Sequence, residues 1–164
     1  MASILREKHD GALARRTDVK LWLRLLSCST VIEKRLRRRF ADRFGITLPR
    51  FDVLATVERH PDGVTMGELS RSLLVSNGNV TALVRQLEQD GLVSTSPSPE
   101  DRRVLIVALT DKGGALFSEL AAAHHEWIEA MFGKMSPEEK KALFGLLARL
   151  KDSIGAAVDR KGEG

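Results

Sequence analysis

The fold is indicated most clearly by two stretches, LSRSLLVSNGNVTALVRQLEQDGLV at residues 69–93 and PEDRRVLIVALTDKG at residues 99–113. In the first stretch a short helical pattern ends near Leu73, a tight turn follows, and Ser76 begins a second helix that ends at Gly91. A short helix, a turn of about three residues and a second helix make up the helix-turn-helix unit.

Two extended runs follow the second helix, at Leu92–Ser96 and Arg103–Leu109. Pro97 and Pro99 lie between them, and because prolines lack amide donors they suit an exposed connection. A hairpin in this position gives the winged variant of the unit. The sequence therefore predicts a mainly α fold with a small β-hairpin wing, a winged helix-turn-helix, in which Val64 is extended but unpaired.

Long amphipathic helices flank this unit on both sides. From Lys20 to Phe44 the apolar residues recur at steps of three and four, which places them on one stripe of a rod about 37 Å long. Further helices are expected from Asp111 to Phe132 and from Ser136 onward, where a capping box precedes the pattern. Such stripes need a partner, and a two-fold dimer built on the N- and C-terminal helices supplies one. The stripe of the first helix comprises Leu21, Leu25, Cys28, Ile32, Leu36, Phe40 and Phe44.

These patterns divide the chain into five parts. They are an N-terminal arm at 1–17, a dimerisation helix at 18–45, a winged helix-turn-helix domain at 46–110, C-terminal dimerisation helices at 111–158 and a tail at 159–164.

Composition excludes several classes of protein. The one cysteine cannot form an internal disulfide, which fits a reducing compartment. The longest apolar run, Val104–Leu109, is far shorter than the roughly 20 residues that cross a bilayer. Residues 1–10 lack the apolar stretch of a secretory signal. We expect a cytoplasmic protein that does not associate with a membrane.

Charge is concentrated in one segment. The chain carries 26 basic and 22 acidic residues, a net charge of +4. Residues 33–43 alone account for this excess, while residues 66–110 carry one more acidic than basic side chain. A basic chain is compatible with a nucleic-acid partner. Binding would then depend on where individual charges lie.

The outward face of the helix that Ser76 begins carries side chains suited to reading DNA. Asn pairs with adenine, Arg pairs with guanine, and Thr hydrogen-bonds or touches a thymine methyl group. Gly78 permits close approach of the backbone, and Ser76 with the free amides of the first turn suits a phosphate. The alternative is an ordinary polar helix face with good capping residues. The candidate DNA-binding residues are Ser76, Asn77, Gly78, Asn79, Thr81 and Arg85.

The tip of the predicted hairpin carries Asp101, Arg102 and Arg103. An arginine on a thin hairpin can enter the minor groove, where the potential is most negative. Asp101 is placed to hold one guanidinium by a charge-assisted hydrogen bond. The alternative is an exposed turn without a role in binding.

The two quoted stretches, with GITLPRFDVL at residues 45–54, resemble the MarR family of winged-helix regulators. The similarity includes Asp101 and Arg103 of the wing and extends over about residues 18–157. It implies a homodimer, a palindromic operator in double-stranded DNA, repression of nearby genes, and release by a small, often aromatic ligand. It also implies that Arg103 enters the minor groove and that residues 76–85 read the major groove.

The resemblance further implies a ligand pocket between the dimerisation helices and the DNA-reading part. The chain also resembles the branch that regulates aromatic-acid catabolism, which implies an aromatic acid or its coenzyme A thioester as effector. The phosphates of a thioester would meet Arg35, Arg38 and Arg39. Core packing is the alternative for each pocket residue. The candidate effector-binding residues, chosen as apolar walls and an anion partner, are Trp22, Leu26, Arg50, Phe51 and Leu54.

Other modes of sensing stay open. Cys28 suggests redox sensing, but its place on the apolar stripe predicts a buried structural cysteine. His125 and Glu129, one helical turn apart, suggest metal sensing, although the adjacent His124 points about 100° away from His125. We expect neither a metal nor a cofactor.

Two other classes of function compete with that of a DNA-binding regulator. The sequence carries no glycine-rich phosphate loop, paired nucleophile and base, or metal-ligand cluster, so an enzyme is not expected. A winged helix that binds protein instead of DNA is the remaining class.

Overall fold

In the computed structural model, residues 17–73 and 77–159 are described, and the chain divides into two compact units, residues 1–125 and 126–164. The predicted arm, apart from its last residue, the turn before the second helix of the unit and the end of the tail lie outside the described residues. So does the predicted cap Ser76.

Helix α1, Thr17–Phe44, ends as predicted at Gly45, whose φ of 62° is a conformation that glycine adopts readily. Burial within the chain is confined to the C-terminal part of α1, where Leu36 and Phe40 are buried. Cys28, expected to be buried, is exposed. That expectation was wrong for the single chain, because the apolar stripe extends well beyond the part of α1 that the chain itself covers.

Helix α2, Leu48–Glu58, begins after Thr47, with Pro49 in its first turn. The Thr47 hydroxyl makes no capping bond. Instead the amides of Arg50 and Phe51 each donate to the Thr47 carbonyl oxygen at 3.1 Å. Backbone geometry and the proline are thus sufficient to begin α2.

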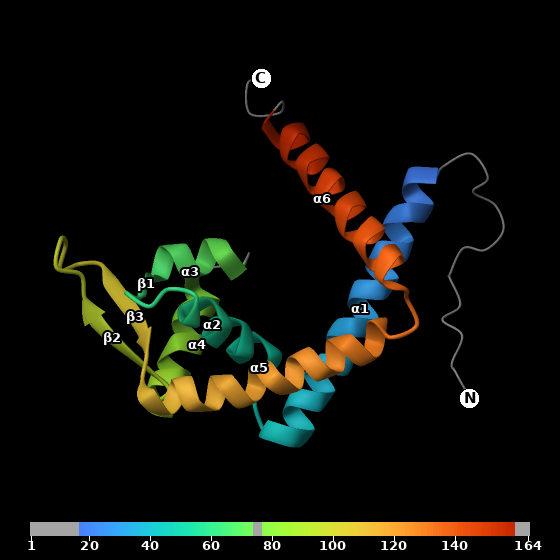
Figure 1. Ribbon diagram of the computed structural model, residues 1–164. Coiled ribbons are helices and arrows are strands. Elements are labelled where there is room, and N and C mark those ends of the chain that lie inside the picture. The colour runs from blue at the N-terminus through green and yellow to red at the C-terminus, as the bar shows by residue number, and fades with distance from the viewer. Residues whose placement is uncertain (1–16, 74–76, 160–164) are drawn as a thin grey trace. The chain divides into compact units, whose positions relative to one another are not determined.

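Helices α3, Met66–Leu73, and α4, Asn77–Gln89, form the predicted helix-turn-helix and pack against α2 (Figure 1). Helix α3 begins with a capping box between Thr65 and Glu68. The Glu68 amide donates to Thr65 Oγ1 at 3.3 Å, and the Thr65 amide donates to Glu68 Oε2 at 2.9 Å. The inner face of α4 is buried, with Val80, Val84 and Leu87 at 0–3% exposure.

The wing is a three-stranded antiparallel sheet and not a simple hairpin. Strands β2, Val93–Pro97, and β3, Leu105–Leu109, pair with Val93 opposite Leu109. Strand β1, Val64–Thr65, adds to the free edge of β3, giving the order β1-β3-β2. The prediction that Val64 is unpaired was therefore wrong, because Val107 lies opposite it and both side chains are buried.

Helix α5, Asp111–Phe132, begins at Thr110, whose Oγ1 accepts the Gly113 amide at 3.0 Å. Helix α6, Pro137–Asp159, begins with a capping box between Ser136 and Glu139. Both helix starts were predicted from the sequence. Apolar residues of α6 are exposed, among them Phe144, Leu147 and Ile154. Within the described ranges, no helix combines the length and the apolar character needed to span a membrane.

Candidate nucleic-acid interface

The outer face of α4 is solvent-exposed along the predicted reading surface. Gly78, Asn79, Thr81 and Arg85 are all exposed. A Cβ added at Gly78 would meet no atom within 4 Å, so this position leaves the first turn open to a close approach by another molecule. Asn77 is the first residue of α4.

The C-terminal end of α4 is fixed to the wing by a side chain that the sequence analysis did not single out. Glu88 Oε1 accepts hydrogen bonds from the Thr95 hydroxyl at 2.6 Å and from the Thr95 amide at 3.2 Å. A glutamate seven residues before a strand threonine carries no recognisable sequence signal. These bonds join α4 directly to strand β2.

The residues that follow α4 are fixed to two further helices. Gly91 has a φ of 69°, and the Leu92 amide donates to the Leu87 carbonyl at 2.9 Å, which is a Schellman-type end. The guanidinium of Arg50, on α2, pairs with the carboxylate of Asp90. Lys112 Nζ, on α5, donates to the Asp90 carbonyl oxygen at 2.8 Å. Helix α4 is therefore held from three directions at this end.

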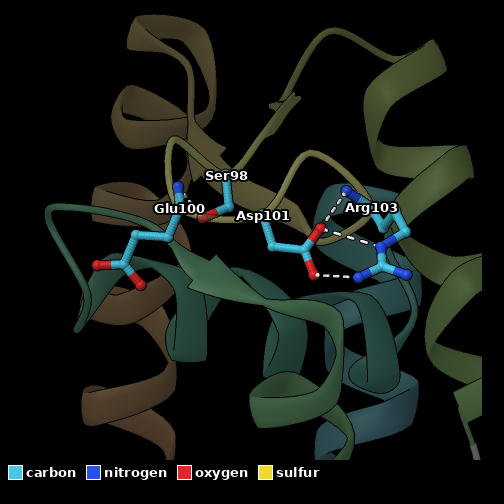
Figure 2. Close-up of polar contacts among 4 residues, drawn as sticks. All are labelled: Ser98, Glu100, Asp101 and Arg103. Atoms are coloured by element: carbon cyan, nitrogen blue, oxygen red, sulfur yellow. Dashed lines mark hydrogen bonds and ion pairs between the residues drawn. The ribbon is translucent and has the colours of Figure 1, made fainter.

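At the wing tip, Asp101 holds Arg103 by three hydrogen bonds (Figure 2). Asp101 Oδ1 accepts from the Arg103 amide at 3.0 Å and from Nε at 3.2 Å, while Oδ2 accepts from Nη2 at 3.4 Å. The Arg103 side chain is 92% exposed. The turn is closed by the Ser98 amide, which donates to the Val104 carbonyl at 2.7 Å. The result is a guanidinium that is oriented from within the turn yet open to solvent.

These bonds also affect the charge of Asp101. The hydrogen bond from the Arg103 amide, followed by that from the Arg103 side chain, lowers the pKa of the Asp101 carboxyl below its usual value. Asp101 therefore stays ionised at neutral pH and continues to orient Arg103. Arg102 is exposed beside them.

The basic residues near the end of α1 are exposed and partly balanced by local acids. Arg37 pairs with Glu33, and Arg38 Nε lies 3.4 Å from Asp42 Oδ2. Arg35 and Arg39 are exposed on the same helix.

The five predicted effector residues do not form one site within a single chain. Phe51 and Leu54 are buried in the core, and Arg50 lies beside them on α2 with its side chain 18% exposed. Trp22 is 59% exposed and Leu26 is 42% exposed. Of these residues, the structure therefore brings together only the three on α2.

Helix geometry gives the reason for this separation. Helix α1 meets α2 near its C-terminal end, where the Phe40 ring stacks on Phe51 at a centroid distance of 4.6 Å. Trp22 and Phe40 are 18 positions apart on α1, about 27 Å along its axis. The first part of α1 therefore cannot reach α2 of the same chain.

Phe51 belongs instead to an aromatic cluster that the sequence analysis missed. Its ring lies 4.9 Å from the His124 ring and 6.0 Å from Phe117, both on α5. Burial, followed by the nearby charge of His125, lowers the pKa of His124 below its usual value. His124 is therefore a half-buried, neutral ring packed among aromatic residues. Among residues 17–73 and 77–159, no three potential ligands are grouped to hold a metal ion.

A helix-turn-helix that exposes Asn, Thr and Arg on its second helix, beside a wing that orients an arginine, defines a winged-helix DNA-binding regulator. A sequence model of the MarR family matches residues 44–104. The chain is also 30% identical over 128 residues to the HTH-type transcriptional regulator PecS of Dickeya dadantii. This alignment covers 77% of this chain and 76% of PecS. The chain belongs to the MarR family. It is a DNA-binding transcriptional regulator and not an enzyme.

Solved structures agree with this assignment. A MarR family transcriptional regulator from Silicibacter pomeroyi is 29% identical, with a TM-score of 0.73 over 88% of this chain and 99% of that chain. The fold is also shared by BpsR of Bordetella bronchiseptica, at 22% identity and a TM-score of 0.71 over 87% of this chain and 99% of BpsR. The DNA binding of BpsR is described as regulated by 6-hydroxynicotinic acid.

Proposed function

We propose that this regulator is a homodimeric repressor that reads a palindromic operator and leaves it when a small aromatic acid, or its coenzyme A thioester, binds. The observation that carries the DNA-reading part is the joint arrangement of α4 and the wing. Helix α4 carries the exposed face, and the wing carries the oriented guanidinium of Arg103. The hydrogen bond between Glu88 and Thr95 joins α4 to the wing directly.

In this proposal the two elements read different grooves. The first turns of α4 enter the major groove, where Asn77, Asn79, Thr81 and Arg85 meet base edges and Gly78 allows close approach. Ser76 precedes them at the phosphate backbone. Arg103 enters the minor groove, Asp101 sets its direction, and Arg102 meets the adjacent phosphates.

The dimer part of the proposal is supported by uncovered apolar side chains. On α1 these include Leu21, Trp22 and Leu26, and on α6 they include Leu147 and Ile154, all at least 40% exposed. Large apolar side chains on successive turns of two long helices are typical of surfaces that become buried on association. A second copy would then place two α4 helices about 34–36 Å apart, one turn of DNA.

The effector part is supported by chemistry at two places. Arg50 offers a guanidinium beside the apolar core of α2, which suits an aromatic acid. In a dimer, Trp22 and Leu26 would reach the pocket from the partner copy, because α1 of the same chain does not bring them there. The relative BpsR responds to 6-hydroxynicotinic acid, an aromatic acid of this kind. Arg35, Arg38 and Arg39 are the residues that would meet the phosphates of a thioester.

The test is binding to the DNA upstream of the chain's own gene, measured by fluorescence anisotropy. We expect tighter binding to this duplex than to one of scrambled sequence, with affinity falling steeply as salt rises. Benzoate and benzoyl coenzyme A are then added separately, and the one that lowers the affinity identifies the effector class. In vitro transcription from the same region should fall when the chain is added. Equal affinity for both duplexes would contradict sequence-specific reading, and increased transcription would contradict repression.

Redox sensing is a second candidate, favoured by the exposure of Cys28 on α1. It predicts that hydrogen peroxide releases the wild-type chain from DNA and leaves the Cys28→Ser variant bound. Equal behaviour of the two chains would exclude it. We place the protein in the cytoplasm, because its proposed DNA partner lies there.

A further inference from the structure

Arg50 uses only part of its hydrogen-bonding capacity. Its Nη2 pairs with Asp90 Oδ2, while its Nε is buried and lacks a hydrogen-bond partner among the described residues. The Nε–H and one Nη2–H of arginine lie along the same edge of the guanidinium, and a carboxylate can engage both at once. Asp90 thus fills half of the edge that a carboxylate normally occupies.

The wing of the same molecule shows the complete arrangement. Arg103 donates from Nε to Asp101 Oδ1 and from Nη2 to Asp101 Oδ2, so both positions of this edge are used. At Arg50 the corresponding Nε is withdrawn from solvent as well as unpaired. An unpaired buried donor is costly, so a carboxylate that engaged both nitrogens would satisfy Arg50 better than Asp90 does.

Asp90 can lose its ion pair with Arg50 more easily than Arg50 can lose its pair with Asp90. The Asp90 side chain is 53% exposed, so water can solvate its carboxylate without rearrangement. The Arg50 side chain is only 18% exposed and needs an anion in place. When another carboxylate replaces Asp90, water can therefore solvate the Asp90 carboxylate. Arg50 keeps an anionic partner and gains a hydrogen-bond acceptor for its Nε.

Asp90 also lies where such an exchange would reach the DNA-reading helix. It directly follows α4, and its contacts tie that end of the helix to α2 through Arg50 and to α5 through Lys112. Loss of the Arg50 contact removes this ion pair with α2 and leaves the hydrogen bond from Lys112 in place. A ligand bound at Arg50 would thereby loosen α4 without touching its DNA-binding face.

We propose that the carboxylate of the effector replaces Asp90 on the guanidinium of Arg50, and that this exchange releases the C-terminal end of α4 and lowers affinity for DNA. The proposal rests on the function proposed above and makes it more specific. It assigns Arg50 as the carboxylate receptor, Asp90 as the competing internal anion, and a free aromatic carboxylate, in preference to a neutral ester or thioester, as the ligand class.

The experiment uses benzoate and its neutral analogue benzamide as probes on the full-length chain. Calorimetric titration measures probe binding, and anisotropy measures the affinity for the upstream duplex with and without each probe. For the wild type we expect benzoate to bind at least about tenfold more tightly than benzamide, and to weaken DNA binding. Equal binding of the two probes, or no binding of benzoate at millimolar concentration, would overturn the proposal.

Two variants test the exchange itself. Asp90→Asn replaces the competing anion by a neutral amide, so we expect benzoate to bind about tenfold more tightly and ligand-free DNA affinity to fall. Arg50→Lys keeps a cation for Asp90 but has no two-nitrogen edge, so we expect benzoate binding to drop about tenfold. The matched control is Arg59→Lys at the C-cap of α2, where Arg59 Nε donates to the Ala55 carbonyl, and it should leave both measurements unchanged.

The outcomes separate this inference from the proposed function. If the ligand-free wild type fails to prefer its upstream duplex, the proposed function is wrong. If the wild type binds DNA and benzoate releases it, but neither variant changes the benzoate affinity, the proposed function stands and the exchange is wrong.

Discussion

Arg103 is a residue whose orientation depends on a neighbour, since Asp101 accepts hydrogen bonds from both its amide and its guanidinium. We predict that Arg103→Ala weakens operator binding by about 1–3 kcal/mol, because the minor-groove contact is lost. Anisotropy titration of wild type and variant measures this difference. The change lies at an exposed tip, so the thermal midpoint should not move. Unchanged affinity would contradict a minor-groove role.

The contribution of Asp101 can be separated from that of Arg103 by a double-mutant cycle. Asp101→Ala alone should weaken binding although it removes a negative charge, because Arg103 loses its fixed direction. In the Arg103→Ala background the same change should strengthen binding slightly, since only the charge effect remains. Additive effects of the two substitutions in anisotropy titrations would show that Asp101 does not orient Arg103.

Arg85 lies on the exposed face of α4 and should act differently from the wing. We predict that Arg85→Ala costs about 1–3 kcal/mol of operator affinity and relaxes preference at one base pair. Binding to a set of single-base operator variants measures this preference. A loss that is equal for every sequence would indicate that Arg85 contacts phosphate and not a base.

At the scale of elements, α5 starts in close contact with the segment that follows α4. A Cβ added at Gly113 would lie 1.8 Å from the Leu92 carbonyl oxygen, whereas one added at Gly114 would meet nothing within 4 Å. We predict that Gly113→Ala lowers the free energy of unfolding by about 3 kcal/mol, through displacement of the α4–β2 connection. Urea denaturation measures it. The adjacent control, Gly114→Ala, should be neutral or stabilising by up to about 1 kcal/mol, and equal effects at the two positions would contradict this packing.

The aromatic cluster between α1, α2 and α5 predicts a pH dependence of stability. Burial lowers the pKa of His124 in the folded chain, so the unfolded chain binds its proton more readily. The stabilising contribution of the neutral ring is complete above about pH 6.5, the usual pKa, and is lost as the pH falls through that value toward the folded pKa. His124→Phe keeps a ring in the cluster and should flatten this part of the stability curve.

Denaturation midpoints at several pH values between 5 and 7.5 measure the effect. His125→Gln is the matched control, because His125 is exposed and is the smaller cause of the shift. It should retain most of the pH dependence. A His124→Phe variant with the same pH dependence as the wild type would contradict a neutral, packed His124.

The elements were predictable wherever a local signal specified them. The capping residues Thr65, Thr110 and Ser136 each mark a helix start that the structure confirms, because a cap bonds to amides only a few residues away. Strand β1 was not recognised as part of the sheet, since its partner Val107 is distant in sequence and two residues carry no periodicity.

The candidate site likewise contains residues that a local sequence pattern indicates and residues that it cannot indicate. The reading face of α4 and the Asp101–Arg103 pair follow from local spacing. The Arg50–Asp90 pair and the ring contact of Phe51 with His124 join helices that are far apart in the chain, so no local pattern could indicate them. Burial of Cys28 was wrongly expected, because an apolar stripe specifies which side of α1 is buried but not which molecule covers it.

At the scale of the whole molecule, the exposed apolar residues of α6 should matter for assembly. We predict that Leu147→Asp shifts the protein to a monomer and sharply reduces operator affinity, since a charge cannot be buried unpaired in an interface. Sedimentation equilibrium measures the mass. Arg149→Asp places the same side chain about 200° around the helix and should leave the dimer intact. If both variants sediment like the wild type, α6 does not contribute its Leu147 face to a dimer.

Selection of bound sequences from a random duplex library, followed by sequencing, shows whether two copies of α4 read successive grooves of one duplex. We predict an inverted repeat whose half-site centres lie about one helical turn apart, 10–10.5 base pairs. Enrichment of a single unpaired half-site, or of no sequence at all, would contradict it.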